Sequence, residues 1–233
     1  MRGAARLVLA SKSPARLTTL RNAGVDPLVM VSAVDENAVA AALPASASPA
    51  QLVSALAEAK AVSVAQELTV ALNSAEVAAD QNVSDQPHPG KYLVLGCDSM
   101  LEIGGKMVGK PITPEVARQR IREMRGINAT LWTGHSLVVV DDLGQWEAGK
   151  VNTRAASTIV HFGDISDEEI DAYIETGEPL NVAGSFTIDG LGGPFVLGVT
   201  GDPHSVVGVS LPLLRGLVKE AGVFWPDLWE ASS

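Results

Sequence analysis

The sequence has little of what would place it in a secreted or membrane class. It contains one cysteine in 233 residues, which excludes an intramolecular disulfide framework and suits a reducing compartment. No apolar run approaches the roughly 20 residues that span a bilayer. The first ten residues contain only a four-residue apolar run, Leu7 to Ala10, and no cleavage site follows. We therefore expect a cytoplasmic protein without a membrane partner.

Several catalytic signatures are also missing. There is no G-x-S-x-G elbow, so a serine hydrolase finds little support, and no glycine-rich Walker loop. The four histidines show no metal-ligand spacing. The single cysteine, Cys97, has no basic partner in sequence, and we interpret it as a small buried residue.

The charge of the chain is acidic overall but basic at one end. A net charge of −10 argues against nonspecific nucleic-acid binding, which needs a basic face. Residues 1–25 nevertheless contain five basic residues and no acid. This stretch is either an exposed basic face that arose by chance or a local site for a small phosphate compound. Composition alone leaves both interpretations open.

Apolar runs and capping signals predict an α/β fold, with a mixed central sheet and flanking helices in one domain over residues 1–233. The core must be built from Leu, Val, Ile and Ala, because aromatic residues make up only 4%. We expect strands over Arg6–Ala10, Leu28–Val34, Tyr92–Leu95, Leu131–Asp141 and Val151–Phe162. We expect helices over Pro14–Ala23, Pro49–Leu72, Pro114–Arg125, Asp167–Thr176 and Leu213–Ala221.

Two segments carry no regular pattern. Residues 73–91 are rich in Asn, Ser, Asp and Gln, with two prolines and a glycine, and predict a flexible surface insertion. Residues 223–233 form a tryptophan-containing tail without a clear purpose, whose Trp residues could pack back onto the core.

The segment Ser11-Lys12-Ser13-Pro14-Ala15-Arg16 stands where a predicted strand passes into a helix. Free N–H groups and the helix dipole favour an anion at such a position. Serine hydroxyls can donate to phosphate oxygens, and Arg16 can contact two of them at once. The alternative is an ordinary capped helix with solvated basic residues, and from this segment alone it is favoured because strand–turn–helix starts are common.

Four other charged residues are candidates. Asp98 comes directly after a predicted strand, a place where carboxylates hold metals or activate water, although an Asx turn is an alternative. Lys110 lies in a loop constrained by Pro111, and either contacts a phosphate or is solvated. Nothing local distinguishes a functional role for Glu36 or Lys60 from surface decoration.

Taken together, these segments resemble the Maf family of nucleotide pyrophosphatases. The matching motifs, in order, are Leu-Ala-Ser-Lys-Ser-Pro-Ala-Arg (9–16), Val-Asp-Glu (34–36), Glu-Ala-Lys-Ala (58–61), Gly-Cys-Asp-Ser (96–99), Gly-Lys-Pro (109–111), Thr-Gly-Glu-Pro (176–179), Ala-Gly-Ser-Phe (183–186) and residues 206–212. Each motif alone is weak, but eight in the same order over some 200 residues are specific.

The resemblance implies an elongated fold related to the inosine-triphosphate pyrophosphatases, with a site in a cleft between two lobes. It implies that Asp98 activates water and that Glu36 and Asp98 bind a divalent metal cation, Mg²⁺ or Mn²⁺. It also implies that four residues hold a nucleoside triphosphate: Ser11, Arg16, Lys60 and Lys110. A homodimer is a further expectation from the family.

Family members differ in the base that they prefer, and the positions that correlate with this choice correspond to Ala15, Ser99 and Asp189. Ala15 replaces a bulkier residue, and Asp189 stands where the pyrimidine-preferring group has glutamine. An ionised Asp189 cannot donate an amide hydrogen bond, so it would accept from exocyclic N–H groups of the base. Neither known specificity transfers simply.

Two functions follow from these observations. The first is hydrolysis of (d)NTPs, including non-standard or modified ones, to the monophosphate and pyrophosphate. The alternative, suggested by the family's link to septum formation, is a nucleotide-binding regulator of cell division without turnover. The intact Asp98 and Glu36 favour the enzyme, since a pure binder has little need of a base and metal ligands.

Overall fold

The computed structural model describes residues 5–79, 90–141, 143–146 and 150–229. These residues form a seven-stranded mixed sheet in the order β2-β1-β3-β5-β6-β7, with β4 paired to β3 beside that path. The strands are β1 (Ala5–Leu9), β2 (Leu28–Val29), β3 (Lys91–Ile103), β4 (Lys106–Val108), β5 (Asn128–Asp141), β6 (Val151–Phe162) and β7 (Val196–Thr200). β1 runs parallel to β2 and β3, whereas the remaining pairs are antiparallel.

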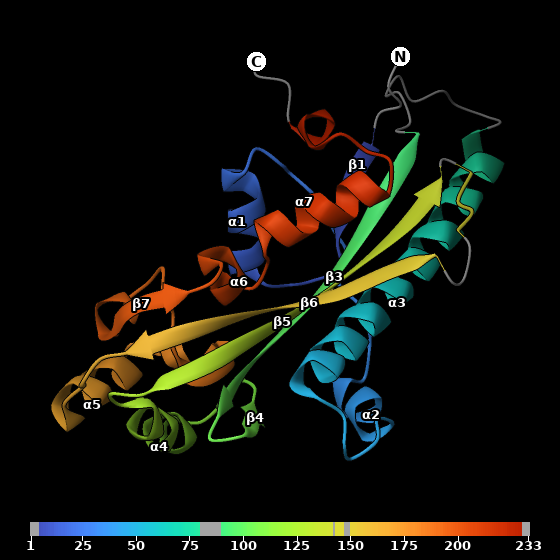
Figure 1. Cartoon of the computed structure of the whole chain (residues 1–233). Helices are drawn as coiled ribbons and strands as arrows, with labels where there is room; N and C mark the ends of the chain where they lie inside the picture. Colours follow the sequence, from blue (N-terminus) through green and yellow to red (C-terminus); the bar gives the residue numbers. More distant parts are fainter. Residues whose placement is uncertain (1–4, 80–89, 142, 147–149, 230–233) are drawn as a thin grey trace.

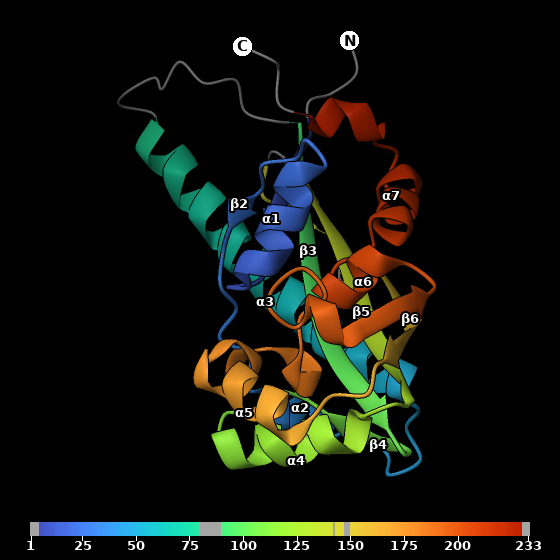
Figure 2. The ribbon, with the colours of Figure 1, turned by 90° about the vertical axis from the view of Figure 1, so that its left-hand side faces the viewer.

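Helices cover both faces of this sheet (Figures 1 and 2). They are α1 (Pro14–Asn22), α2 (Glu36–Ala41), α3 (Pro49–Ala79), α4 (Pro114–Met124), α5 (Asp167–Glu175), α6 (Pro203–Val207) and α7 (Leu211–Glu220). Short 3₁₀ turns occupy Glu178–Asn181, Ala183–Ser185, Gly193–Phe195 and Trp225–Leu228. The long helix α3 packs against β3, β5 and β6 on one face, and α1, α6 and α7 lie on the other. This arrangement confirms the predicted α/β class.

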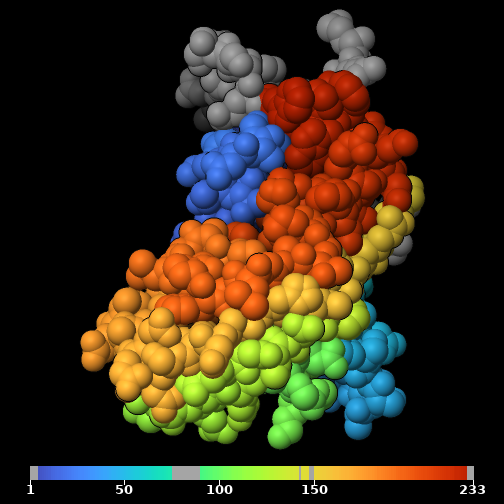
Figure 3. All heavy atoms as spheres, turned by 60° about the vertical axis from the view of Figure 1, so that its left-hand side comes forward, coloured from blue at the N-terminus to red at the C-terminus, as the bar shows by residue number. Residues whose placement is uncertain are grey.

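The strands β3, β5 and β6 run through the whole length of the molecule (Figure 1). At one end the core holds Leu7, Leu95, Leu214 and their neighbours beneath α1 and α7, with a second layer beneath α3. At the other end a separate cluster forms around Leu101, Ile121 and Ile170, between the sheet, α4 and α5. In the space-filling view of Figure 3, α1 and the C-terminal segments share one end of the surface, and α4 and α5 form the other. The two lobes thus share one sheet.

Three sequence predictions were wrong in extent. β3 does not stop at Leu95, because it stays paired with β5 from Lys91↔Asp141 to Glu102↔Thr130. Continuous pairing overrides the low strand propensity of glycine and aspartate. The helix predicted to end at Leu72 continues to Ala79, so residues 73–79 are not part of a loop. Residues 80–89 of the predicted insertion lie outside the described residues. The second strand is limited to Leu28–Val29.

A capping box begins α5 close to the predicted start of this helix, with Ser166 and Glu169 each bonded to the other's backbone N–H. Part of the tail packs onto the core, where Val223 and Leu228 are buried with the cluster beneath α7. Residues 230–233 lie outside the described part. Among the helices that the structure describes, none combines the length and apolar composition needed to cross a bilayer.

Candidate active site

The candidate site lies where one edge of β3 loses its strand neighbours. β1 accompanies β3 as far as Leu95, and β4 joins it again from Leu101. Among the described residues, no strand pairs with this edge of β3 over residues 96–100. Successive side chains of a strand point to opposite faces, so Asp98 and Ser99 flank the open edge from its two sides.

On the α3 face, an ammonium group joins two carboxylates. Lys60 Nζ lies 2.6 Å from Asp98 Oδ1 and 2.7 Å from Glu36 Oε1. The side chains of Lys60 and Asp98 are each only 10% exposed, whereas that of Glu36 is 57% exposed. Glu36 is the first residue of α2, which Asp35 caps through its side chain. Three segments distant in sequence are therefore brought to one point, which the sequence could not show.

Two glycines allow α3 to come this close to the sheet. A Cβ atom on Gly96 would lie 2.1 Å from the carbonyl oxygen of Ala57, and one on Gly134 would lie 2.1 Å from that of Val53. Gly134 is the direct cross-strand partner of Asp98. The helix backbone thus rests on glycine positions on both sides of Asp98, and this contact brings Lys60 over the carboxylate.

The environment of Asp98 shifts its protonation. Burial raises the pKa of the Asp98 carboxyl above its ordinary value, and the cations Lys60 and Arg16 offset part of that effect. Its second oxygen, Oδ2, has no hydrogen-bond partner among the described residues. A carboxylate with a raised pKa and a free oxygen has the properties of a general base.

On the opposite face, Arg16 joins three segments of the chain. Its Nε donates to the carbonyl of Gly208 at 2.9 Å, Nη1 donates to Ser11 Oγ at 3.1 Å, and Nη2 donates to Ser99 Oγ at 3.1 Å. The sequence places Arg16 in the first turn of α1, which Ser13 caps and Pro14 begins, as predicted. Contacts within the protein therefore fix the orientation of the Arg16 guanidinium.

Both cations keep unused donors. A guanidinium has five N–H groups and an ammonium three. Arg16 uses three of them, which leaves one on each terminal nitrogen, and Lys60 uses two and keeps one. The two side chains can accordingly bind a phosphate without breaking the contacts that hold them in place.

The structure does not bring every predicted residue into these contacts. Lys110 is exposed at the loop after β4, and Asp189 is exposed between two 3₁₀ turns. Ala15 is half-buried in α1. Ser99 Oγ accepts from Arg16 and lies 3.0 Å from Thr133 Oγ1. The roles of these four residues stay predictions.

Sequence reasoning missed the partners that hold Arg16 and Ser99. Thr133 Oγ1 donates to the carbonyl of Ser205 at 2.9 Å, so the Ser99 hydroxyl donates to Thr133. Gly208 has a φ of 121°, and a Cβ atom there would lie 2.9 Å from Arg16 Nε. One signal was available, because an isolated glycine inside a strand pattern, such as Gly134, indicates a close backbone approach.

The residues present fit a divalent cation. The oxygens Glu36 Oε1 and Asp98 Oδ1 both lie within 2.7 Å of one cationic centre, Lys60 Nζ. Mg²⁺ is held in proteins by one or two carboxylates, with waters and substrate phosphates as further ligands. No cluster of three or more metal-ligating side chains occurs in the described ranges.

Comparisons of the sequence with known proteins identify a family. The family model described as Maf-like protein matches residues 6–221. A protein of Mycobacterium sp. (strain JLS), named nucleoside triphosphate pyrophosphatase, is 47% identical over 96% of this chain and 98% of its own length. A protein of the same name from Nocardia farcinica is 49% identical over 96% of both chains. Both the family model and these relatives match nearly the whole chain. The chain therefore belongs to the Maf-like family.

Proposed function

We propose that this protein hydrolyses nucleoside triphosphates to the nucleoside monophosphate and pyrophosphate. The similarity to relatives that carry the name nucleoside triphosphate pyrophosphatase supports this function. The observation that carries it is the pairing of a buried general base, Asp98, with two oriented cations, Lys60 and Arg16, at the open edge of β3. Such an arrangement suits phosphoryl transfer, in which positioning and charge stabilisation supply most of the catalysis.

In the proposed mechanism, Asp98 Oδ2 accepts a proton from a water molecule as its oxygen attacks the α-phosphorus. The bond between the α-phosphorus and the oxygen that bridges to the β-phosphorus breaks, and pyrophosphate leaves with the bonding electrons. Lys60, Arg16, Ser11 and Lys110 hold the triphosphate and stabilise the charge that develops on its oxygens. The proton then passes from Asp98 to solvent, which restores the base.

The charges of the site indicate why a metal belongs to this proposal. Lys60 and Arg16 are balanced by Glu36 and Asp98, so the cluster alone offers no net positive charge to a polyanion. A divalent cation, Mg²⁺ or Mn²⁺, bound by Glu36 and Asp98 would supply that charge. The exposed Lys12 and Lys110 add cations at the rim.

The proposal also covers the selection of the nucleobase. We assign its selection to Ala15, Ser99 and Asp189, and expect modified or non-standard nucleotides among the substrates. The small Ala15 leaves room for a base substituent, and the Asp189 carboxylate is an acceptor for N–H groups.

Pyrophosphate release from a nucleotide panel tests the function. The panel comprises dTTP, UTP, CTP, GTP, ITP, 7-methyl-GTP and 5-methyl-UTP, each with Mg²⁺ or Mn²⁺. We expect turnover of at least one member, and a loss of roughly 10²–10⁴-fold in Asp98→Asn, as is typical when a general base is removed. Glu67→Gln, an exposed carboxylate on α3, is the control. Binding without turnover across the panel would instead support the regulatory alternative.

A further inference from the structure

A second carboxylate, Glu178, gathers an unusual number of neutral donors. Its Oε1 accepts from Tyr173 Oη at 2.9 Å, Thr187 Oγ1 at 2.5 Å and the Gly192 N–H at 3.1 Å. Its Oε2 accepts from the Leu191 N–H at 3.0 Å. Neither Lys nor Arg pairs with it among the described residues. The carboxylate therefore acts as the centre of a hydrogen-bond network and not as half of an ion pair.

The chain between Thr187 and Gly192 is shaped to fit this carboxylate. A Cβ atom on Gly190 would lie 2.6 Å from Glu178 Oε2, and one on Gly192 would lie 2.6 Å from Tyr173 Oη. Partial burial acts to raise the pKa of Glu178, but hydrogen bonds from Thr187 and Leu191 outweigh it and hold the pKa below its ordinary value. Glu178 thus stays ionised, and it keeps its acceptors, throughout the neutral range.

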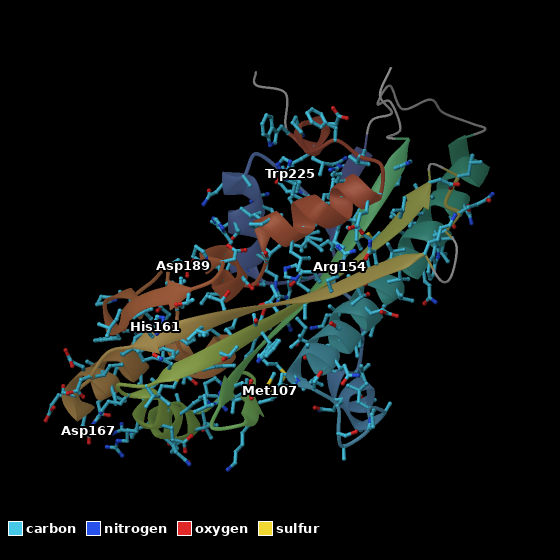
Figure 4. The ribbon with its side chains drawn as sticks, in the orientation of Figure 1. Met107, Arg154, His161, Asp167, Asp189 and Trp225 are labelled. Atoms are coloured by element: carbon cyan, nitrogen blue, oxygen red, sulfur yellow. The ribbon has the colours of Figure 1, made fainter. Side chains whose placement is uncertain are left out.

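The segment that Glu178 holds carries Asp189 between its two attachment points. Thr187 precedes Asp189 by two residues and Leu191 follows it by two, and both are bonded to Glu178. Asp189 itself is exposed, and within the described part of the chain its carboxylate has no hydrogen-bond or ion-pair partner. Figure 4 places it on the side of the molecule that carries α1 and α6. An unpaired acceptor is thereby presented on a segment that is fixed from both sides.

We propose that Glu178 is a positioning residue for base selectivity, which holds residues 187–192 so that Asp189 can accept N–H groups from the base. This inference rests on the proposed function, and on Asp189 as the residue that contacts the base. A fixed carboxylate accepts from the N1–H and amino group of guanine together. Opposite uracil or thymine it faces carbonyl oxygens on both sides of the single N3–H, which is repulsive. Selectivity for guanine over uracil then requires the segment to stay in place.

The test compares GTP with UTP, because the two share ribose and triphosphate and differ in the base. The ratio of kcat/KM for GTP to that for UTP is measured in the wild type and in Glu178→Gln. Glutamine keeps Oε1 as an acceptor but places an amide donor opposite the Leu191 N–H. We expect the ratio to fall about tenfold or more, the scale of discrimination by a few pocket contacts. Glu175→Gln, an exposed carboxylate at the end of α5, should leave it unchanged.

A double-mutant cycle separates positioning from a general structural role. If Glu178 acts through Asp189, then Glu178→Gln changes the ratio in the wild type but not in an Asp189→Ala background. An equal loss for GTP and UTP, or the same change of ratio in both backgrounds, would overturn the inference. Tyr173→Phe removes one donor to Glu178 and the acceptor of the Thr187 N–H, and it leaves the other three donors of Glu178 in place. It should shift the ratio in the same direction by a smaller factor. If the Glu178→Gln protein does not fold, Tyr173→Phe takes its place in the measurement of the ratio.

Failure of the pyrophosphatase function can be distinguished from failure of the positioning role of Glu178. A wild-type protein that binds nucleotides without hydrolysing them disproves the pyrophosphatase, and the ratio is then taken from the Kd values of GTP and UTP. A change of that ratio in Glu178→Gln would still support the positioning role, and an unchanged ratio would contradict it.

Discussion

Two regions of the molecule use the same ion-pair chemistry in opposite environments. Beneath α3, the Lys60 and Asp98 side chains meet at 2.6 Å, each only 10% exposed. Between α4 and α5, Arg122 and Asp167 meet at 2.8 Å with 47% and 51% of their side chains exposed. Arg125 also pairs with Asp167, and Arg118 pairs with Asp171. The partners are similar, and burial is the difference.

Burial decides what each pair can do. Exposed pairs gain little, because water and salt screen them. The buried pair must offset the cost of removing two charges from water, so it is weak evidence for stability. A charge retained at that cost, with a shifted pKa and beside an open sheet edge, indicates a functional site. The α4–α5 pairs need no function to explain them.

Removing the buried cation should have the largest effect on stability. We expect Lys60→Met to lower the free energy of unfolding by about 3–5 kcal/mol at pH 7, because it leaves the Asp98 charge buried without a partner. Urea unfolding measures this loss. The loss should shrink in acid, where the Asp98 carboxyl takes up a proton. A Lys60→Met protein as stable as the wild type at pH 7 would contradict the account.

A buried histidine extends the comparison to pH. His135 Nε2 accepts the Ser210 N–H at 2.7 Å and Nδ1 lies 3.1 Å from the Thr133 carbonyl, so both contacts fit the neutral ring. Burial lowers the pKa of His135 from 6.5 to about 4. The unfolded chain therefore binds the extra proton first, and this contribution to stability is complete above pH 6.5 and is lost as the pH falls toward 4.

The shift corresponds to about 3 kcal/mol between pH 7 and pH 4. We expect His135→Asn to show a flatter loss of stability over that range than the wild type, measured by urea unfolding at a series of pH values. The exposed His204→Gln is the control and should keep the wild-type slope. Identical pH slopes for His135→Asn and the wild type would show that the ring is not held neutral.

The close contact of α3 with the sheet can be tested by adding one methyl group. Gly134→Ala forces a Cβ atom against the Val53 carbonyl, and overpacking of this kind costs about 1–3 kcal/mol. It should also lower turnover, since α3 carries Lys60. Gly216→Ala is the matched control, because nothing lies within 4 Å of its Cβ in α7, and it should stabilise by about 0.5–1 kcal/mol. Equal thermal midpoints for Gly134→Ala and Gly216→Ala would contradict the close approach of the Val53 carbonyl to position 134.

The smallest effect belongs to the exposed pairs. Hydrogen bonds from Arg125 and Arg122 hold the pKa of Asp167 below its ordinary value, but the group is exposed and screened. We expect Asp167→Asn to leave turnover unchanged and to shift the thermal midpoint far less than Lys60→Met. A shift as large as that of Lys60→Met would remove the distinction between the two regions.

The same comparison explains what the sequence could predict. Caps and periodicity located α1, α5 and the β5–β6 pair, because those signals are local. The extent of β3 depended on its partner β5, and the polar Gly96–Ser99 run concealed a continuing strand. Asp98, Lys60 and Glu36 were individually identified through their motifs, but their meeting at one point is a long-range contact. Glu178 and Gly208 lie in matched motifs, but their contacts with Thr187, Leu191 and Arg16 join segments distant in sequence or depend on backbone groups, so the motifs did not reveal these roles. Thr133 lies in no motif.

The most direct test of the proposed chemistry is hydrolysis in ¹⁸O-labelled water, with the products separated and weighed by mass spectrometry. Asp98 is placed to activate water for attack on the α-phosphorus, so the label should appear in the nucleoside monophosphate and not in pyrophosphate. Label in pyrophosphate, or release of inorganic phosphate with a nucleoside diphosphate, would contradict the account.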